Sequence, residues 1–133
     1  MREIKFRGKR LDNGVCVEGS LLQDDYGVCM IVEFVDHHEQ WHEVDPDTVG
    51  QYTGLKDKNG SDIWEGDIVM VESRDEEYDN LLVGLPFLIM FSYGGFCIAE
   101  DEESPWGSIS NLDILEVIGN IHDNPELLKG GEQ

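Results

Sequence analysis

The chain has 133 residues, with 9 Lys and Arg against 29 Asp and Glu, which gives a formal net charge of −20. This length fits one domain or two very small ones. The charge argues against an electropositive groove for nucleic acid, because phosphate binding needs Lys and Arg. No apolar stretch is long enough to cross a membrane, and no apolar segment follows the basic N-terminus as in a signal peptide. We therefore expect a cytoplasmic protein that contacts neither a membrane nor nucleic acid directly.

The charge is unevenly distributed along the sequence. Residues 1–10 contain five of the nine basic residues and a single acid, Glu3, whereas the remainder contains four basic and 28 acidic residues. Acidic clusters lie at residues 75–79 and 100–103. Such clusters are typical of solvated loops that keep a protein soluble. The alternative is a surface that attracts a basic partner.

The first 35 residues predict a three-stranded meander. Apolar and polar residues alternate over residues 4–7, which is typical of a half-buried strand. Asn13-Gly14 supplies the positive φ angles of a tight hairpin turn, and alternation resumes over residues 15–21. A second turn at residues 24–27 precedes a run rich in β-branched residues at 28–35, which predicts the third strand.

The middle of the chain continues with short strands and turns. Asp45-Pro46 predicts a turn, because proline fixes φ and aspartate bonds nearby amides. Residues 49–55 then form a short strand, residues 57–60 a tight turn, and residues 63–71 the strongest strand of the chain. Within that strand, Gly66 allows a sharp entry and Asp67 caps free N–H groups, a pattern common in small SH3-like barrels.

The last third is also mainly β. Residues 73–80 and 100–110 predict acidic loops, and between them residues 86–99 predict a hairpin. A final strand covers residues 115–121, and Asn124-Pro125 begins a short helix. We predict a mainly β fold with a short-stranded meander over residues 1–53, an SH3-like small barrel over 54–124, and a short helix and tail over 125–133. Alternatively, these parts form one compact unit.

Residues His38-Glu39-Gln40-Trp41-His42 match the zinc-protease pattern H-E-x-x-H. That chemistry needs both histidines on one face of a helix, with the glutamate as general base on zinc-bound water. The flanking residues predict a strand and a turn instead, which favours a hairpin or an edge strand with exposed histidines. Zinc binding by His37, His38 and His42 without catalysis is the remaining alternative.

No other pattern predicts a cofactor or a metal. Three cysteines, Cys16, Cys29 and Cys97, lie far apart and predict free thiols. No phosphate loop, dinucleotide motif, nucleophile elbow or EF-hand loop occurs in the sequence. We expect neither a catalytic constellation nor a bound cofactor.

Aromatic and polar residues gather in two short segments, 51–54 and 64–67, which either line a binding face or serve the turns of the fold. Among the surface or near-surface positions, we expect five to be the most informative about binding: Arg7, Tyr52, Trp64, Glu65 and Asp67.

Three segments resemble the YopX family of bacteriophage and prophage proteins. They cover residues 1–9, residues 44–69 and residues 117–128, in family order. The resemblance implies a phage or prophage origin, a cytoplasmic location in a bacterial host and a mainly β fold. It carries over no catalytic residues, because the family looks functionally uncharacterised. The segment before Val44 looks variable in the family, which argues further against a zinc centre there.

The sequence therefore predicts a non-enzymatic phage accessory protein, a β module that binds a host or phage protein or associates with itself as an oligomer. The alternative is an acidic mimic of DNA that inhibits a host nucleic-acid-binding protein by occupying its basic cleft. The third hypothesis is a zinc hydrolase that uses His38, Glu39 and His42.

Overall fold

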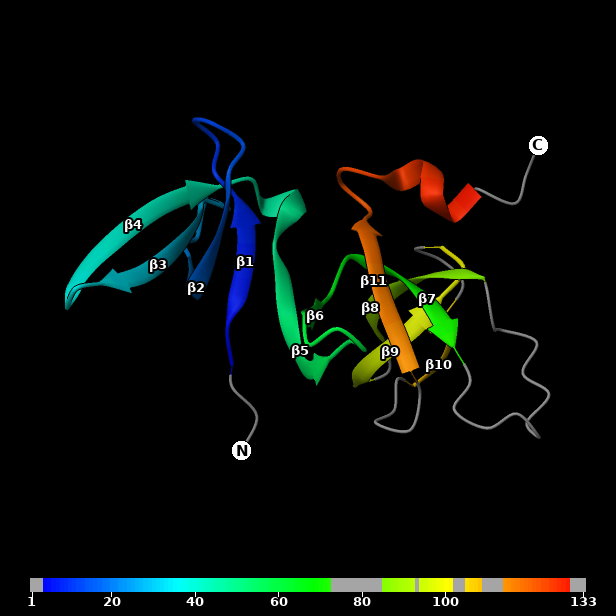
Figure 1. The fold of residues 1–133 in the computed structure, drawn as a ribbon. Coiled ribbons are helices and arrows are strands. Elements are labelled where there is room, and N and C mark those ends of the chain that lie inside the picture. The colour runs from blue at the N-terminus through cyan, green and yellow to red at the C-terminus, as the bar shows by residue number, and fades with distance from the viewer. Residues whose placement is uncertain (1–3, 73–84, 93, 102–104, 109–113, 130–133) are drawn as a thin grey trace. The chain divides into compact units, whose positions relative to one another are not determined.

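The computed structural model describes residues 4–72, 85–92, 94–101, 105–108 and 114–129. Nearly all of these residues lie in antiparallel strands or in the turns between them, so the predicted mainly β fold is confirmed (Figure 1). The chain divides into two compact units, residues 1–54 and residues 55–133. Among the helices of the described ranges, none is long and apolar enough to cross a membrane.

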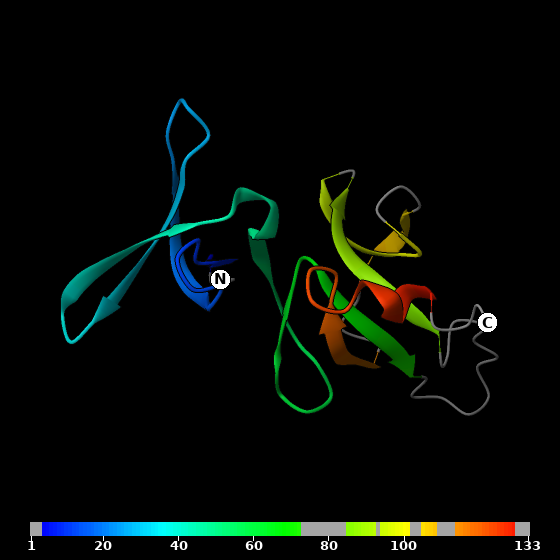
Figure 2. The ribbon, with the colours of Figure 1, turned by 90° about the horizontal axis from the view of Figure 1, so that it is seen from above.

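The first unit is built on a curved antiparallel sheet. Its strands are β1 (Phe6–Lys9), β2 (Cys16–Gln23), β3 (Cys29–Val35), β4 (His38–Val44) and the start of β5 (Gly50–Lys56), with a 3-10 turn η1 (Pro46–Thr48) before β5. The strand order is β4-β3-β2-β1-β5, continued by β6. The predicted meander over the first 35 residues is therefore confirmed. Figure 2 shows the β2–β3 and β3–β4 hairpins projecting in different directions from β1.

One face of this sheet carries the core of the unit, and we call it the inner face. Cross-strand partners share a face, and the register pairs Cys29 with Val44, Ile31 with His42 and Leu21 with Ile31. Cys29, Ile31 and Val44 are buried, and partly buried residues of β1, β2 and the segment before β5 pack against them: Phe6, Val17, Leu21 and Val49. The opposite face, the outer face, is described below as a candidate site.

The end of β4 returns to the end of β1. Arg10 and Val44 form an antiparallel bridge, in which Leu11 N donates to Glu43 O and Asp45 N donates to Lys9 O. Gly8 makes this approach possible, since a Cβ there would lie 3.1 Å from the Val44 side chain. Glycine is also needed at position 19, where a Cβ would lie 2.1 Å from the carbonyl oxygen of Val32.

The second unit contains a separate five-stranded sheet in the order β10-β9-β8-β7-β11. Its elements are β6 (Asp62–Trp64), β7 (Asp67–Glu72), β8 (Pro86–Ser92), β9 (Gly95–Ala99), β10 (Pro105–Ser108), β11 (Ile114–Asn120) and the 3-10 helix η2 (Pro125–Lys129). The core is formed by Ile63, Val69, Val71, Phe87, Ile89, Ile98 and Leu115. The described strands form no closed barrel, although two short twisted sheets of this kind resemble the sheets of small barrels.

Three predicted elements differ in the structure. The single strand expected over residues 63–71 is two strands, because Gly66 adopts a φ of +93° and turns the chain between β6 and β7. The acidic loop expected at residues 100–110 contains β10, which pairs with β9. The helix predicted from Pro125 begins there but has 3-10 geometry. The loop expected at residues 73–80 lies outside the described residues.

Candidate functional site

Of the five predicted binding positions, three are buried rather than at the surface. Tyr52, Trp64 and Asp67 are 6%, 4% and 2% exposed. Arg7 on β1 and Glu65 between β6 and β7 are half-buried. The expectation of exposure is therefore wrong for Tyr52, Trp64 and Asp67, and a binding role for any of the five stays a prediction.

Asp67 closes the turn between β6 and β7. Its Oδ2 accepts a hydrogen bond from Trp64 N at 2.8 Å, and both residues are buried. The intervening Gly66 donates its N–H to Ile89 O and accepts at its own carbonyl from Ile121 N, at 2.8 Å each. The predicted capping role of the aspartate is thus confirmed, and the main chain of Gly66 links this turn to β8 and to Ile121, which follows β11.

Asp57 is a second buried carboxylate, which the sequence presents only as part of a tight turn. Its Oδ1 accepts from the N–H groups of Asn59 and Ser61 at 2.9 Å, and its Oδ2 accepts from Val117 N at 3.0 Å. Burial alone would raise the pKa of Asp57, but these three N–H donors and the charge of Lys58 outweigh it and lower the pKa below 3.8. Such a carboxylate stays ionised and anchors β11 to the turn.

The H-E-x-x-H segment lies on β4, with no helix, and this excludes the protease geometry. His38 and His42 point to the same face of the strand, but four residues of strand separate their Cα atoms by about 13 Å. On a helix the two histidines of this pattern lie on adjacent turns, where both ring nitrogens reach one ion at about 2 Å, and the extended β4 does not provide that spacing. Glu39 points to the other face, and no metal-binding group of His, Cys, Asp or Glu occurs among the described residues. The segment therefore does not form the helical H-E-x-x-H geometry that the zinc hydrolase hypothesis requires.

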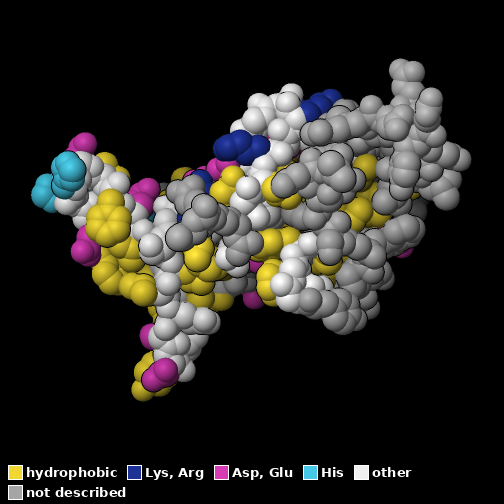
Figure 3. All heavy atoms as spheres, turned by 90° about the horizontal axis from the view of Figure 1, so that it is seen from below, with side chains coloured by type: hydrophobic (Ala, Val, Ile, Leu, Met, Phe, Trp, Pro, Cys, Tyr) yellow, Lys and Arg dark blue, Asp and Glu magenta, His cyan; other side chains and the backbone are white. Residues whose placement is uncertain are grey.

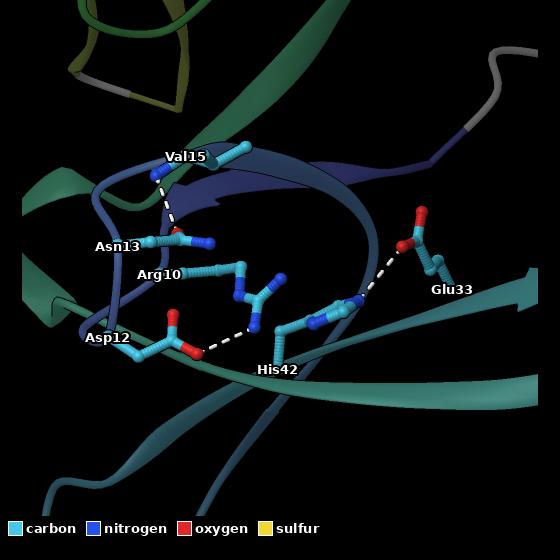
Figure 4. A network of polar contacts seen from close by, with 6 residues as sticks. All are labelled: Arg10, Asp12, Asn13, Val15, Glu33 and His42. Atoms are coloured by element: carbon cyan, nitrogen blue, oxygen red, sulfur yellow. Dashed lines mark hydrogen bonds and ion pairs between the residues drawn. The ribbon is translucent and has the colours of Figure 1, made fainter.

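Polar residues gather instead at the inner face of β3 and β4 (Figure 4). His42 Nε2 lies 2.8 Å from Glu33 Oε1, and Arg10 donates to Asp12 Oδ2 at 2.6 Å. Figure 4 shows the Arg10 side chain between Asp12 and the His42 ring. A histidine held by a carboxylate can serve acid–base chemistry when a reacting group contacts the other ring nitrogen. In this structure the pair links β4 to β3.

None of the three cysteines, all of them described, is in a disulfide, as predicted. Cys16 is exposed, and Cys29 and Cys97 are buried. Burial raises the pKa of the Cys97 thiol, which keeps it protonated and unreactive.

The outer face of β2–β4 carries an exposed apolar surface. The register places Leu22 beside Met30, and Trp41 beside Val32, with Phe34 diagonal to Trp41. Leu22, Phe34 and Trp41 are 46%, 68% and 53% exposed, whereas Val32, the cross-strand partner of Trp41, is buried. We call these five residues the outer-face patch. Most solvent-facing sheet surfaces are polar, so large side chains clustered on one indicate a contact surface.

Polar groups border this patch. Glu39 is the cross-strand partner of Phe34, and its Oε2 accepts from Trp41 Nε1 at 2.9 Å, which fixes the indole ring. Glu43 is the partner of Met30. An open hollow of about 710 Å³ adjoins the patch, and besides Val32 and Phe34 its lining includes the acidic Glu18 and Glu33 and the basic Lys5. Figure 3 shows hydrophobic side chains beside acidic ones on the projecting hairpin whose end carries histidines.

The surroundings of the patch are acidic in sequence. Residues 11–55 contain ten Asp and Glu and no Lys or Arg. The basic residues of the first unit are confined to residues 1–10, on and around β1. The patch thus combines exposed apolar side chains with negative charge.

None of the outer-face patch residues was among the five positions that the sequence predicts for binding. The apolar run at residues 28–35 predicts a strand but not which of its side chains stay exposed. In the structure Cys29, Ile31 and Val32 are buried, whereas Phe34 and Val35 are exposed. A usable signal was present in Trp41 and Phe34, two large side chains close to a hairpin turn rich in polar residues.

The model of the family described as YopX protein matches residues 5–129, nearly the whole chain. The crystal structure of protein EF1440 from Enterococcus faecalis is similar over 96% of this chain and 99% of that chain, with 28% sequence identity and a TM-score of 0.56. No curated protein matches the sequence.

Proposed function

The chain belongs to the YopX protein family, and we propose that it is a non-enzymatic protein-binding module whose contact surface is the outer-face patch. The observation that carries the proposal is the exposure of Leu22, Phe34 and Trp41 together on one face of β2–β4. Aromatic anchors of this kind dominate the energy of protein interfaces.

The size of the patch is sufficient for binding. An aromatic side chain has about 150–250 Å² to bury, and Phe34 and Trp41 keep more than half of theirs exposed. Covering about 100 Å² of each, at roughly 25 cal/mol per Å², contributes about 2.5 kcal/mol per side chain. Two anchors of this magnitude are typical of an interface hot spot. The hydrogen bond from Trp41 to Glu39 holds one of them in place before binding.

A second candidate function is mimicry of DNA, which draws on the ten acidic residues of segment 11–55. Several of these carboxylates are occupied within the fold. Asp24 accepts from the N–H groups of Tyr26 and Val28, and Asp45 accepts from Asp47 N. Their placement follows turn geometry, which favours the protein-binding module over an array of carboxylates spaced like phosphates.

We also propose that the protein acts in the cytoplasm of a bacterium that carries it on a phage or prophage. The resemblance of its three segments to phage and prophage proteins supports this setting. Its partner is then a host or phage protein, and self-association is the competing outcome.

The test is affinity capture with matched variants. The tagged wild-type protein, a Phe34→Ser/Trp41→Ser double variant and a Leu85→Ser control are each used to capture proteins from producing cells, at low and high salt. Leu85 is 48% exposed and lies in the second unit. We expect a partner that survives high salt with the wild type and the control and is lost with the double variant.

Two results would contradict the proposal. A partner retained equally by all three proteins would place binding elsewhere. Basic nucleic-acid enzymes captured only at low salt, irrespective of the variant, would favour DNA mimicry, because electrostatic association weakens with ionic strength.

A further inference from the structure

Strand β4 forms one end of the sheet in the first unit. It pairs with β3 along its whole length, from Cys29 with Val44 to Val35 with His38, without a bulge. On its other side, the described part of the chain pairs only with the C-terminal end of β4, through the bridge between Arg10 and Val44. An edge strand left in this state offers its peptide groups to another strand.

The hydrogen bonds show which residues of β4 face outward. Leu11 N donates to Glu43 O on the side away from β3, and in an antiparallel strand every second residue turns its N–H and C=O to the same side. Trp41 and Glu39 therefore present their peptide groups outward. Within the described residues, no main-chain hydrogen bond meets them on that side.

The side chains at this open edge belong to the outer-face patch and its acidic border. Trp41 and Glu39 point to the outer face, and Glu43 continues the same row. Residues 29–44 carry four acids and no Lys or Arg. A strand added to β4 would place every second side chain beside an indole ring or a carboxylate, and both favour a cation.

We propose that an extended, cationic segment of a partner protein adds to β4 as a further strand between His38 and His42. Its main chain pairs with Glu39 and Trp41. Lys or Arg at alternate positions lie over Glu39 and Trp41, and adjoining apolar residues cover Phe34. This inference rests on the proposed function and names the chemistry of the partner for the same surface.

Charge argues against a second copy of this chain as the added strand. Each copy carries a net charge of −20, and two β4 strands would bring their acidic residues together. The basic strand β1 cannot be donated instead, because it pairs with β2 on one side and β5 on the other. The occupant that fits is a basic segment from another protein.

The direct test uses the wild-type protein and a synthetic peptide in which lysine alternates with valine. We expect the peptide to bind, with an affinity that falls as salt rises, and to slow amide hydrogen exchange at Glu39 and Trp41. An acidic peptide of alternating glutamate and valine should not bind. A lysine–proline peptide has the same charge but lacks the valine N–H donors and the strand conformation, and it should bind at least tenfold more weakly.

Variants separate charge from strand pairing. Glu39→Gln removes the charge and should weaken binding of the lysine–valine peptide about fivefold. Glu39→Pro also removes the outward N–H and should weaken binding of that peptide more than tenfold. As a control, Glu126→Gln removes one exposed charge in the second unit and should leave the affinity for the lysine–valine peptide unchanged. The exchange measurement on the wild type needs no variant to fold.

The outcomes distinguish the two proposals. Equal binding by the lysine–proline peptide, or bound peptide without protection of the Glu39 and Trp41 amides, would overturn strand addition. No peptide binding, while partner capture still depends on Phe34 and Trp41, would overturn this inference and leave the proposed function standing. Loss of that dependence in capture would overturn the proposed function itself.

Discussion

Replacing Asp57 removes three hydrogen bonds to a charged acceptor at once. Hydrogen bonds to charged groups contribute about 1.5–3 kcal/mol each. Asn59 and Ser61 are exposed, so water replaces much of what their N–H groups lose, and these two bonds count for about 0.5 kcal/mol each. Residue Val117 is half-buried in β11, and losing the Asp57 acceptor at its N–H costs about 2 kcal/mol. We expect Asp57→Ala to lower the free energy of unfolding by about 3 kcal/mol.

Chemical denaturation followed by circular dichroism measures this change. Asp24→Ala is the matched control, because Asp24 also accepts two backbone N–H groups, from Tyr26 and Val28, but in an exposed turn. The control should cost less than about 1 kcal/mol. An equal loss of unfolding free energy in the two variants would refute the argument that burial and the link to β11 make Asp57 more stabilising than Asp24.

The remaining predictions concern other positions. The stability contributed by Asp57 should be complete above the pKa of an unfolded aspartate, near 3.8, and should be lost as the pH falls through the lower folded pKa. Acid denaturation should show this loss in the wild type and not in Asp57→Ala, and the same loss in both proteins would contradict the prediction. His37→Gly should raise the unfolding free energy by about 1 kcal/mol, because His37 has a φ of +66° in the β3–β4 turn; no gain on denaturation would contradict this. Gly19→Ala should cost more than about 2 kcal/mol, since its Cβ would meet the Val32 carbonyl, and a neutral thermal melt would contradict that. Trp64→Ala should cost about 3–5 kcal/mol and Trp41→Ala less than about 1, so equal melting temperatures would refute the burial difference.

Local chemistry made much of the fold predictable. The turns predicted at residues 13–14, 24–27 and 57–60 all form, and their glycines Gly14, Gly27 and Gly60 have positive φ. Strand β5 follows its predicted range closely. These features depend on neighbouring residues alone, and the sequence contains all the information they need.

The candidate site depends on pairing between distant segments and was therefore harder to predict from the sequence. Trp64 has polar neighbours in sequence, yet it is buried at the end of β6. Phe34 belongs to an apolar run, yet it is exposed, although Val32 on the same face of β3 is buried. Which face of a strand is covered is decided by distant segments, so alternation and hydropathy cannot determine it.

The central claim is that a partner protein contacts the outer-face patch, and site-specific photo-crosslinking in producing cells tests it most directly. A photoreactive phenylalanine analogue replaces Phe34 in one protein and Phe91, an exposed aromatic residue of β8, in another. The account predicts a discrete adduct with another protein from position 34 and none from position 91. An adduct from position 91 alone, or none from either, would contradict it.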